Sequence, residues 1–257
     1  MRKPARVSAL TASELAPREL AKPTPSLVVS EIFGPTFQGE GPSIGRRCSF
    51  LRLGGCNLHC IWCDTPYTWD WTGRNGKRYE PAVELRRMSA TEVVSRLDQT
   101  RTDMVVISGG EPLLQQKALL PILETASKRG WWIEIETAGT VPPTAETTAH
   151  VSRFNVSPKL ANSGNELEQR YIPVALDALQ ATGKAVWKFV AQAVADLDEA
   201  GEWIELHKLE PVYVMPEGVT VDALSRHSQA IAEAVVGRGW NLTTRLQILL
   251  YGNRRGV

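Results

Sequence analysis

The sequence has few cysteines, almost no net charge and no long apolar run, and each shortage excludes a class of protein. Its four cysteines all lie between positions 48 and 63, too close together to staple a chain of 257 residues with disulfides. The formal net charge is +1, so charge gives no reason to expect a nucleic acid or a membrane surface as partner. No run of eighteen apolar residues occurs, which argues against a transmembrane helix.

The N-terminal part of the sequence has little periodicity. Residues 1–26 are rich in Ala, Pro, Ser and Thr, and we expect a poorly ordered extension there. Charged residues of both signs interrupt this part without an apolar segment, which argues against a secretory signal. Together with reduced thiols, this predicts a cytoplasmic protein. Hydrophobic residues make up 43% of the chain, enough for one large α/β domain over residues 27–257.

The remaining sequence alternates between short apolar runs and helical patterns. Residues 49–53 are expected to form the first buried strand, preceded by a β-prone run at residues 27–33. Residues 246–250, near the end of the chain, also resemble a strand. The other expected strands are residues 104–108, 132–136, 153–156, 186–190 and 212–215.

Helical segments fall between most of these strands. Ser89 to Glu92 match a capping box that starts the first helix, and the next helix should end at Gly130. Six or seven strand–helix units with right-handed crossovers predict an α/β fold, a parallel sheet curled into a partial or near-complete (β/α)6 TIM-like barrel. A later helix should turn one apolar face inward, formed by Val221, Leu224, Ile231 and Val235.

In such barrels ligands bind at the C-terminal ends of the strands, and every chemically suggestive stretch falls at one of these ends. These stretches should therefore lie close together at one end of the barrel. They are the cysteine loop after residue 53, Ser108-Gly109-Gly110-Glu111, Glu136-Thr137, Ser157-Pro158-Lys159 and Met215-Pro216-Glu217-Gly218.

The cysteine loop carries Cys56, Cys60 and Cys63 in a tight spacing that suits one soft metal centre. Three thiolates on a four-iron cluster leave one iron open for small-molecule chemistry. A structural zinc site is the alternative, with Cys48 or His59 as fourth ligand. Cys48 also lies on an apolar run, where a free cysteine is an ordinary core residue.

This spacing resembles that of the radical S-adenosylmethionine (radical SAM) superfamily, and Trp62 stands where that superfamily usually has an aromatic residue. The resemblance implies a 4Fe-4S cluster whose open iron chelates the amino and carboxylate groups of SAM. It also implies that the reduced cluster cleaves SAM to a 5'-deoxyadenosyl radical.

A narrower resemblance covers residues 27 to the C-terminus and is most specific in its first third. The chain is similar to the 7-carboxy-7-deazaguanine synthase family, which uses SAM and Mg2+ to convert 6-carboxy-5,6,7,8-tetrahydropterin to 7-carboxy-7-deazaguanine on the way to queuosine and other 7-deazapurines. The stretches that carry it are Glu31-Ile32-Phe33, Phe37-Gln38-Gly39-Glu40-Gly41, residues 50–58, Cys63-Asp64-Thr65, Ser108-Gly109-Gly110-Glu111-Pro112 and Ser157-Pro158-Lys159.

The resemblance also implies a set of site residues. Cys56, Cys60 and Cys63 would hold the cluster and Thr65 would offer its hydroxyl to Mg2+. Because the radical comes from SAM, no protein acid or base is assigned. The residues implied to line SAM are Trp62, Asp64, Gly110, Ser157, Pro158 and Lys159, with Met215, Pro216, Glu217 and Gly218 from a further loop. Those implied to line the pterin are Phe37, Gln38, Gly39, Arg52 and Ser108.

Chemistry supports two of these assignments. Arg52 can fork onto the substrate carboxylate, and Gln38 can pair with the donor and acceptor edge of a pterin. The resemblance further implies a flavodoxin-like or other one-electron reductant and a homodimer. The sequence departs from the family at Ala138 and in its C-terminal segment. A radical SAM activating enzyme acting on a glycine of a partner protein remains the main alternative.

Overall fold

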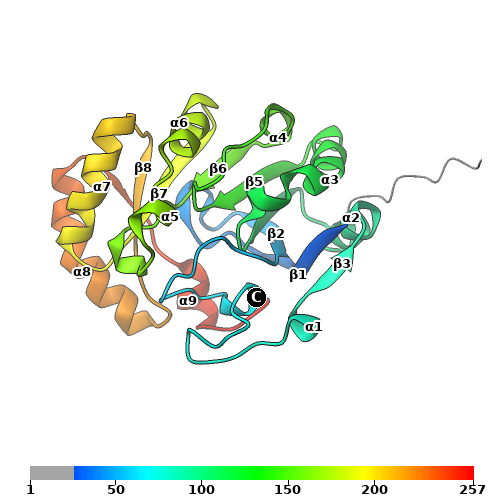
Figure 1. The fold of residues 1–257 in the computed structure, drawn as a ribbon, viewed down its shortest axis with the longest axis horizontal. Coiled ribbons are helices and arrows are strands. Elements are labelled where there is room, and N and C mark those ends of the chain that lie inside the picture. Colours follow the sequence, from blue (N-terminus) through cyan, green and yellow to red (C-terminus); the bar gives the residue numbers. More distant parts are fainter. Residues whose placement is uncertain (1–25) are drawn as a thin grey trace, which may run out of the picture.

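The computed structural model describes residues 26–257, which contain one nine-stranded sheet (Figure 1). The strands are β1 (Leu27–Phe37), β2 (Arg47–Leu53), β3 (Arg86–Met88), β4 (Met104–Gly109), β5 (Trp132–Thr137), β6 (Arg153–Val156), β7 (Ala185–Ala191), β8 (Val212–Pro216) and β9 (Asn241–Leu242). Their order across the sheet is β3-β1-β2-β4-β5-β6-β7-β8-β9. Strand β1 pairs antiparallel with β2 and β3, and β2 to β9 otherwise pair in parallel.

This order leaves β3 and β9 as two free edges, so the predicted α/β partial barrel is confirmed as an open one. The N-terminal extension expected at residues 1–26 lies outside the described residues except for Ser26. The strands expected at residues 49–53, 104–108, 132–136, 153–156, 186–190 and 212–215 are present, with ends shifted by at most two residues. The β-prone run at residues 27–33 is the start of the longer strand β1.

Most of the helices cover the outer, convex side of the sheet (Figure 1). Among residues 26–257, none is both long enough and apolar enough to cross a bilayer. The helices are α1 (Pro81–Glu84), α2 (Ala90–Gln99), α3 (Gln116–Lys128), α4 (Ala145–His150), α5 (Leu167–Arg170), α6 (Pro173–Ala181), α7 (Val194–His207), α8 (Val221–Gly237) and α9 (Leu246–Tyr251).

The helix signals in the sequence are largely confirmed. Ser89 Oγ accepts the Glu92 N–H at 3.3 Å while the Glu92 carboxylate accepts the Ser89 N–H at 2.8 Å, so the capping box starts α2. Helix α3 ends at Lys128, and Gly130 takes the positive φ of 73° that releases the chain from it. Val221 is wrong as an inward residue: it is 51% exposed, because it lies in the first turn of α8.

The strand expected at residues 246–250 is also wrong, because this segment is the helix α9. The run of large apolar residues suggested a buried strand, yet only Ile248 is buried there. Leu249 and Leu250 are about half exposed, at 48% and 51%. A short apolar run does not distinguish a strand from one turn of helix that buries a single side chain.

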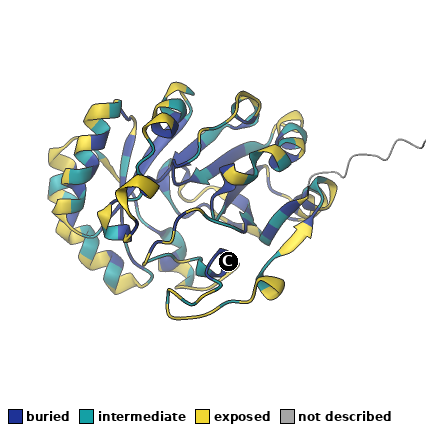
Figure 2. Cartoon of the chain, in the orientation of Figure 1, coloured by how far each residue is buried: buried dark blue, intermediate teal, exposed yellow. Residues whose placement is uncertain are grey.

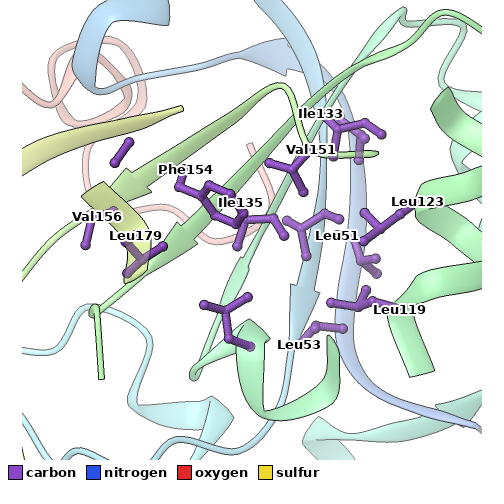
Figure 3. Packing of buried hydrophobic residues seen from close by; sticks show 14 of the residues in the cluster. Leu51, Leu53, Leu119, Leu123, Ile133, Ile135, Val151, Phe154, Val156 and Leu179 are labelled. Carbon is purple, nitrogen blue, oxygen red and sulfur yellow. The ribbon is translucent and has the colours of Figure 1, made fainter. Parts of the chain in front are cut away.

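Side-chain alternation along the strands gives the sheet two different faces. The outer face packs apolar side chains against the helices, as Leu51, Ile133 and Ile135 do beside Leu119 and Leu123 of α3 (Figure 3). Buried residues accordingly follow the sheet while exposed ones follow the outer helix surfaces (Figure 2). The inner face carries polar residues instead: Ser108, Glu134, Asn155 and Lys188 are buried, and Arg52 and Glu136 are half-buried.

Candidate active site

A cavity of about 450 Å³ opens at the C-terminal ends of the parallel strands, within the range of ordinary small-molecule sites. It collects residues from stretches far apart in the sequence, as the position of the motifs predicts. Pro158 and Pro216 do not line it. The other residues implied by the resemblance all do: Phe37, Gln38, Gly39, Arg52, Cys56, Cys60, Trp62, Cys63, Asp64, Thr65, Ser108, Gly110, Ser157, Lys159, Met215, Glu217 and Gly218.

The three cysteines of the loop after β2 lie on this cavity and pack around Leu58 and Ala138. Burial raises the pKa of all three thiols, that of Cys56 to about 12. Thiolates in such a place need the positive charge of a metal centre. Each sulfur also has an N–H donor: Leu58 N to Cys56 at 3.4 Å, Asn165 Nδ2 to Cys60 at 3.2 Å and Trp69 Nε1 to Cys63 at 3.3 Å. This donor set fits an iron–sulfur cluster.

A zinc cage completed by Cys48 or His59 is not supported. Cys48 is fully buried at the start of β2 with Met104 and Val106, in a cluster separate from the other cysteines, which confirms it as a core residue. His59 is exposed and packs edge-on against Trp69, with ring centroids 4.9 Å apart. In the described part of the chain, no three Cys, His, Asp or Glu side chains converge on a single metal ion.

Glycines bring the loop after β4 against the cysteine loop. A Cβ on Gly110 would lie 1.7 Å from the Gly55 carbonyl oxygen, so only glycine fits this contact. The Glu111 N–H donates to the same carbonyl at 2.8 Å. The buried Glu111 carboxylate then accepts the Ala138 N–H at 2.8 Å and the Thr137 hydroxyl at 2.8 Å. The Gly-Gly-Glu stretch therefore fixes three strand-end loops to one another.

One end of the cavity combines an aromatic ring with a cation. Lys159 Nζ lies 5.8 Å from the centre of the Trp62 ring and donates to the Ser157 carbonyl and hydroxyl oxygens at 2.6 and 3.0 Å. Asp64 pairs with Arg245 nearby. An adenine ring and a carboxylate would find a flat apolar surface and a positive charge here.

The other end has an arginine among aromatic rings. Arg52 Nε donates to Glu31 at 3.0 Å, and the Tyr67 hydroxyl donates to the same carboxylate oxygen at 3.0 Å. The guanidinium lies 5.5 Å from the centre of the Phe33 ring, which stacks on Phe50. Glu31 accepts from Nε of Arg52. The two terminal nitrogens of the guanidinium can then donate to both oxygens of a carboxylate.

Gln38 is buried and has protein partners for both ends of its amide. Its Nε2 lies 3.3 Å from Glu136 and 3.4 Å from Glu134, and its Oε1 accepts the Glu40 N–H at 3.2 Å. In this arrangement its side chain positions carboxylates rather than presenting a free donor and acceptor edge. The role of Gln38 toward the pterin stays a prediction.

Sequence reasoning missed a buried charge network on the inner face of the sheet. Glu40 pairs with Lys188 and, at 3.2 Å, with Arg245, while Glu136 lines the same space. Burial raises the pKa of Glu136, despite the nearby Lys188. A lysine inside the otherwise apolar run of residues 185–191 was the one available signal. No feature of the neighbouring sequence indicated that Arg245 belongs to this network.

Two further segments reach the cavity. The segment after the cysteine loop contributes Tyr67, Trp69, Lys77 and Tyr79, so it shapes the pocket. Residues 252–257 also line the cavity, and the C-terminus lies over the barrel mouth in Figure 1. Arg255 holds this tail by pairing with Glu31 and Glu84 and by stacking 3.7 Å above the centre of the Tyr67 ring.

Comparisons with known proteins agree with this geometry. Residues 51–211 match the family model of the Radical SAM superfamily. A 7-carboxy-7-deazaguanine synthase of Pyrobaculum aerophilum is 34% identical over 91% of this chain and 98% of its own. One of Rhodopirellula baltica is 30% identical over 90% of this chain and 89% of its own.

A solved structure is similar as well. The crystal structure of QueE from Escherichia coli superposes with a TM-score of 0.66 at 26% identity, covering 86% of this chain and 94% of its own. The activating-enzyme alternative is not favoured, since these relatives carry the name of the synthase. With the three-cysteine loop on the cavity and relatives matched over nearly their full length, the chain belongs to the 7-carboxy-7-deazaguanine synthase family of the radical SAM superfamily.

Proposed function

We propose that the protein converts 6-carboxy-5,6,7,8-tetrahydropterin to 7-carboxy-7-deazaguanine with loss of ammonia, a step in 7-deazapurine biosynthesis. The observation that carries this function is that one cavity is lined by two kinds of binding group. Cysteine thiols and the Trp62–Lys159 pair line it, and so does the half-buried Arg52 among aromatic rings. When bound, the 4Fe-4S cluster and SAM supply a 5'-deoxyadenosyl radical. The chain's own residues then have to bind and orient the substrate.

Each end of the cavity has a distinct task in this proposal. Cys56, Cys60 and Cys63 hold the cluster, while Trp62 and Lys159 receive the adenine and the carboxylate of SAM. The remaining residues implied for SAM are Asp64, Gly110, Ser157, Pro158, Met215, Pro216, Glu217 and Gly218, all at the C-terminal ends of strands or in the loops that follow them.

At the substrate end Arg52 forks onto the carboxylate of the pterin, and Phe37, Gln38, Gly39 and Ser108 complete the pocket. The half-buried Glu136 carboxylate, whose described partner is Gln38, accepts an N–H of the heterocycle. The apolar rings of Phe33 and Phe50, which line the same cavity, help to keep water from the radical.

Thr65, which lines the same cavity, offers its hydroxyl to Mg2+. A hard ion of this kind takes one or two protein ligands and completes its shell with water and substrate oxygens. The proposal also includes a flavodoxin-like or other one-electron reductant and a homodimer, which follow from the family resemblance, and a cytoplasmic location, which follows from the reduced thiols. Light scattering of the purified protein tests the dimer.

The decisive experiment is a reaction with defined components. Anaerobically reconstituted enzyme is incubated with SAM, dithionite, Mg2+ and the carboxypterin, and the product is identified by mass. Formation of 7-carboxy-7-deazaguanine and ammonia in equal amounts is the expected result. Cleavage of SAM without any change in the pterin would overturn the assigned substrate while leaving the superfamily chemistry in place.

A further inference from the structure

The cysteine loop is fastened to a turn at residues 161–165, a feature that the proposed function does not require. This turn follows β6 and lies more than a hundred residues away in the sequence. Four hydrogen bonds join them: Ile61 N to Ser163 O at 3.0 Å, His59 N to Asn165 Oδ1 at 2.8 Å, Trp62 Nε1 to Asn162 O at 2.9 Å and Asn165 Nδ2 to Cys60 Sγ at 3.2 Å.

Asn165 has the central place in this junction. Its side-chain oxygen accepts the His59 N–H, and its amide N–H₂ donates to the Ser163 hydroxyl at 3.0 Å and to the sulfur of Cys60 at 3.2 Å. The Arg170 guanidinium donates to the Asn165 carbonyl at 3.2 Å and pairs with Glu199, so the backbone beneath the amide is held as well. The donor to Cys60 is therefore built into the fold.

Trp69 brings an equivalent donor to a different sulfur. Its indole N–H lies 3.3 Å from Cys63 Sγ, and the side chain is only 7% exposed. Its segment is tied to the cysteine loop by Gly55 N to Thr68 O at 2.8 Å and by Asn75 Nδ2 to Cys60 O at 3.1 Å. A buried indole fixed in this way has one available acceptor direction, toward the sulfur.

Donors aimed at the sulfurs of an iron–sulfur cluster act on its reduction potential. Reduction adds one electron, and an N–H group stabilises the more negative state more strongly. We propose that the Trp69 indole and the Asn165 amide are positioning residues that raise the reduction potential of the cluster held by Cys56, Cys60 and Cys63. The inference rests on the cluster of the proposed function and deepens it, because the cluster must accept an electron before SAM is cleaved.

The test measures the potential itself on loaded protein. Trp69→Phe keeps an aromatic ring and removes the indole donor, and Asn165→Ala removes the amide. The matched controls are Trp71→Phe, in the same segment, and Asn162→Ala, in the same turn with an amide that donates to the Val190 carbonyl. Each variant is reconstituted anaerobically, its iron content is measured, and the cluster is titrated with dithionite under electron paramagnetic resonance without SAM or substrate.

At a fixed solution potential, each test variant should show about a tenfold lower ratio of reduced to oxidised cluster, which is about 59 mV for a one-electron couple. The double variant should shift further, since the two donors meet different sulfurs. The controls should keep the wild-type midpoint. Loaded test variants that also keep this midpoint would overturn the inference and leave the proposed function intact. A wild-type protein that binds no iron would overturn both.

A second measurement decides the case in which Asn165→Ala loads poorly. The reduced wild-type cluster is examined by electron–nuclear double resonance before and after exchange into D2O. Exchangeable proton couplings that diminish in Trp69→Phe support the indole donor. Identical exchangeable couplings in the two proteins would show that the indole does not reach the sulfur, and the inference would fail.

Discussion

Arg52 is the residue on which the assignment of an anionic substrate depends. Replacing it with alanine should weaken substrate binding by about 2–5 kcal/mol, because the substrate carboxylate would be left buried without its partner. Cluster content and the basal cleavage of SAM should stay unchanged. The dissociation constant of the carboxypterin, measured by anaerobic calorimetry, provides the check.

Two further variants sharpen this measurement. Arg52→Lys keeps the charge but loses the fork, so it should recover only part of the affinity. Arg87→Ala, on the exposed edge strand β3, removes a side chain whose only hydrogen bond within residues 26–257 is to the Ser26 hydroxyl, and this variant should bind substrate like wild type. An Arg52→Ala protein with wild-type affinity would remove Arg52 from the substrate site.

Thr65 makes a separate prediction about the metal ion. Thr65→Ala should blunt the stimulation of turnover by Mg2+ and raise the Mg2+ concentration for half-maximal rate about tenfold, while SAM cleavage without substrate persists. Thr65→Ser retains the hydroxyl and should restore the response. A magnesium titration of Thr65→Ala that superposes on wild type would exclude the hydroxyl as a ligand.

At the level of single residues, motif chemistry was informative for side chains that line the cavity and weak for those that act through another residue. Cys56, Cys60 and Cys63 were identifiable from spacing alone. Glu31, which orients Arg52, and Asn165, which meets Cys60, were not. Their partners lie 21 and 105 positions away in the sequence, and only the folded chain brings these pairs together.

Among the elements, the C-terminal segment departs most from expectation. Helix α9 replaces the expected strand and turns the following residues back over the cavity (Figure 1). Gly252 ends the helix with a φ of 66°, a backbone conformation that favours glycine. Strand and helix periods are indistinguishable over five residues, four of them apolar, so this element could not be predicted from its own pattern.

The tail that follows α9 is held by Arg255, and removing that anchor should loosen it. Arg255→Ala should speed hydrogen exchange of the amides of residues 252–257 and raise the substrate dissociation constant about tenfold, about 1.4 kcal/mol. The free energy of unfolding should change by less than about 1 kcal/mol, because the arginine is 41% exposed.

Arg254→Ala is the matched control for hydrogen exchange, since no ion pair of Arg254 occurs among residues 26–257. It should leave the tail as protected as in wild type. Mass spectrometry after pepsin digestion resolves the two variants. Equal exchange of the tail in Arg255→Ala and wild type would mean that the ion pairs with Glu31 and Glu84 do not order it.

In the molecule as a whole, the sheet is open, so contacts outside the strand ladder have to hold the first and last parts of the barrel together. Hydrogen bonds from Gly41 N to Thr243 Oγ1 at 3.0 Å and from Leu246 N to Gly39 O at 2.9 Å join the loop after β1 to the chain after β9. The parallel strand order was predictable from alternating patterns. This closure was not, because it depends on a carboxylate whose partners come from two distant segments, β7 and the start of α9.

Glu40 is that carboxylate. A substitution at Glu40 tests whether it holds these two segments together. It accepts from Lys188 of β7, from Arg245 before α9 and from Gln247 within α9. Burial alone would raise the pKa of Glu40, but these two cations hold it well below its usual 4.5. Glu40→Gln leaves both cations buried without their shared partner, so it should lower the free energy of unfolding by about 3–5 kcal/mol at pH 7.

The pH dependence of this loss separates Glu40 from a packing effect. A group with a depressed pKa in the folded state stabilises the protein above its unfolded pKa, and this contribution is lost as the pH falls toward the folded pKa. The difference in free energy of unfolding between wild type and Glu40→Gln should therefore be largest at pH 7 and narrow below about pH 4.5.

Glu80→Gln is the control, because it removes an exposed carboxylate 3.5 Å from Arg78. Its free energy of unfolding should differ little from that of wild type at any pH. Urea unfolding of the cluster-loaded proteins at pH 7, 5 and 3.5 measures the free energy of unfolding of wild type, Glu40→Gln and Glu80→Gln. A gap that stays constant across this range would mean that the carboxylate charge does not hold the ends of the barrel together.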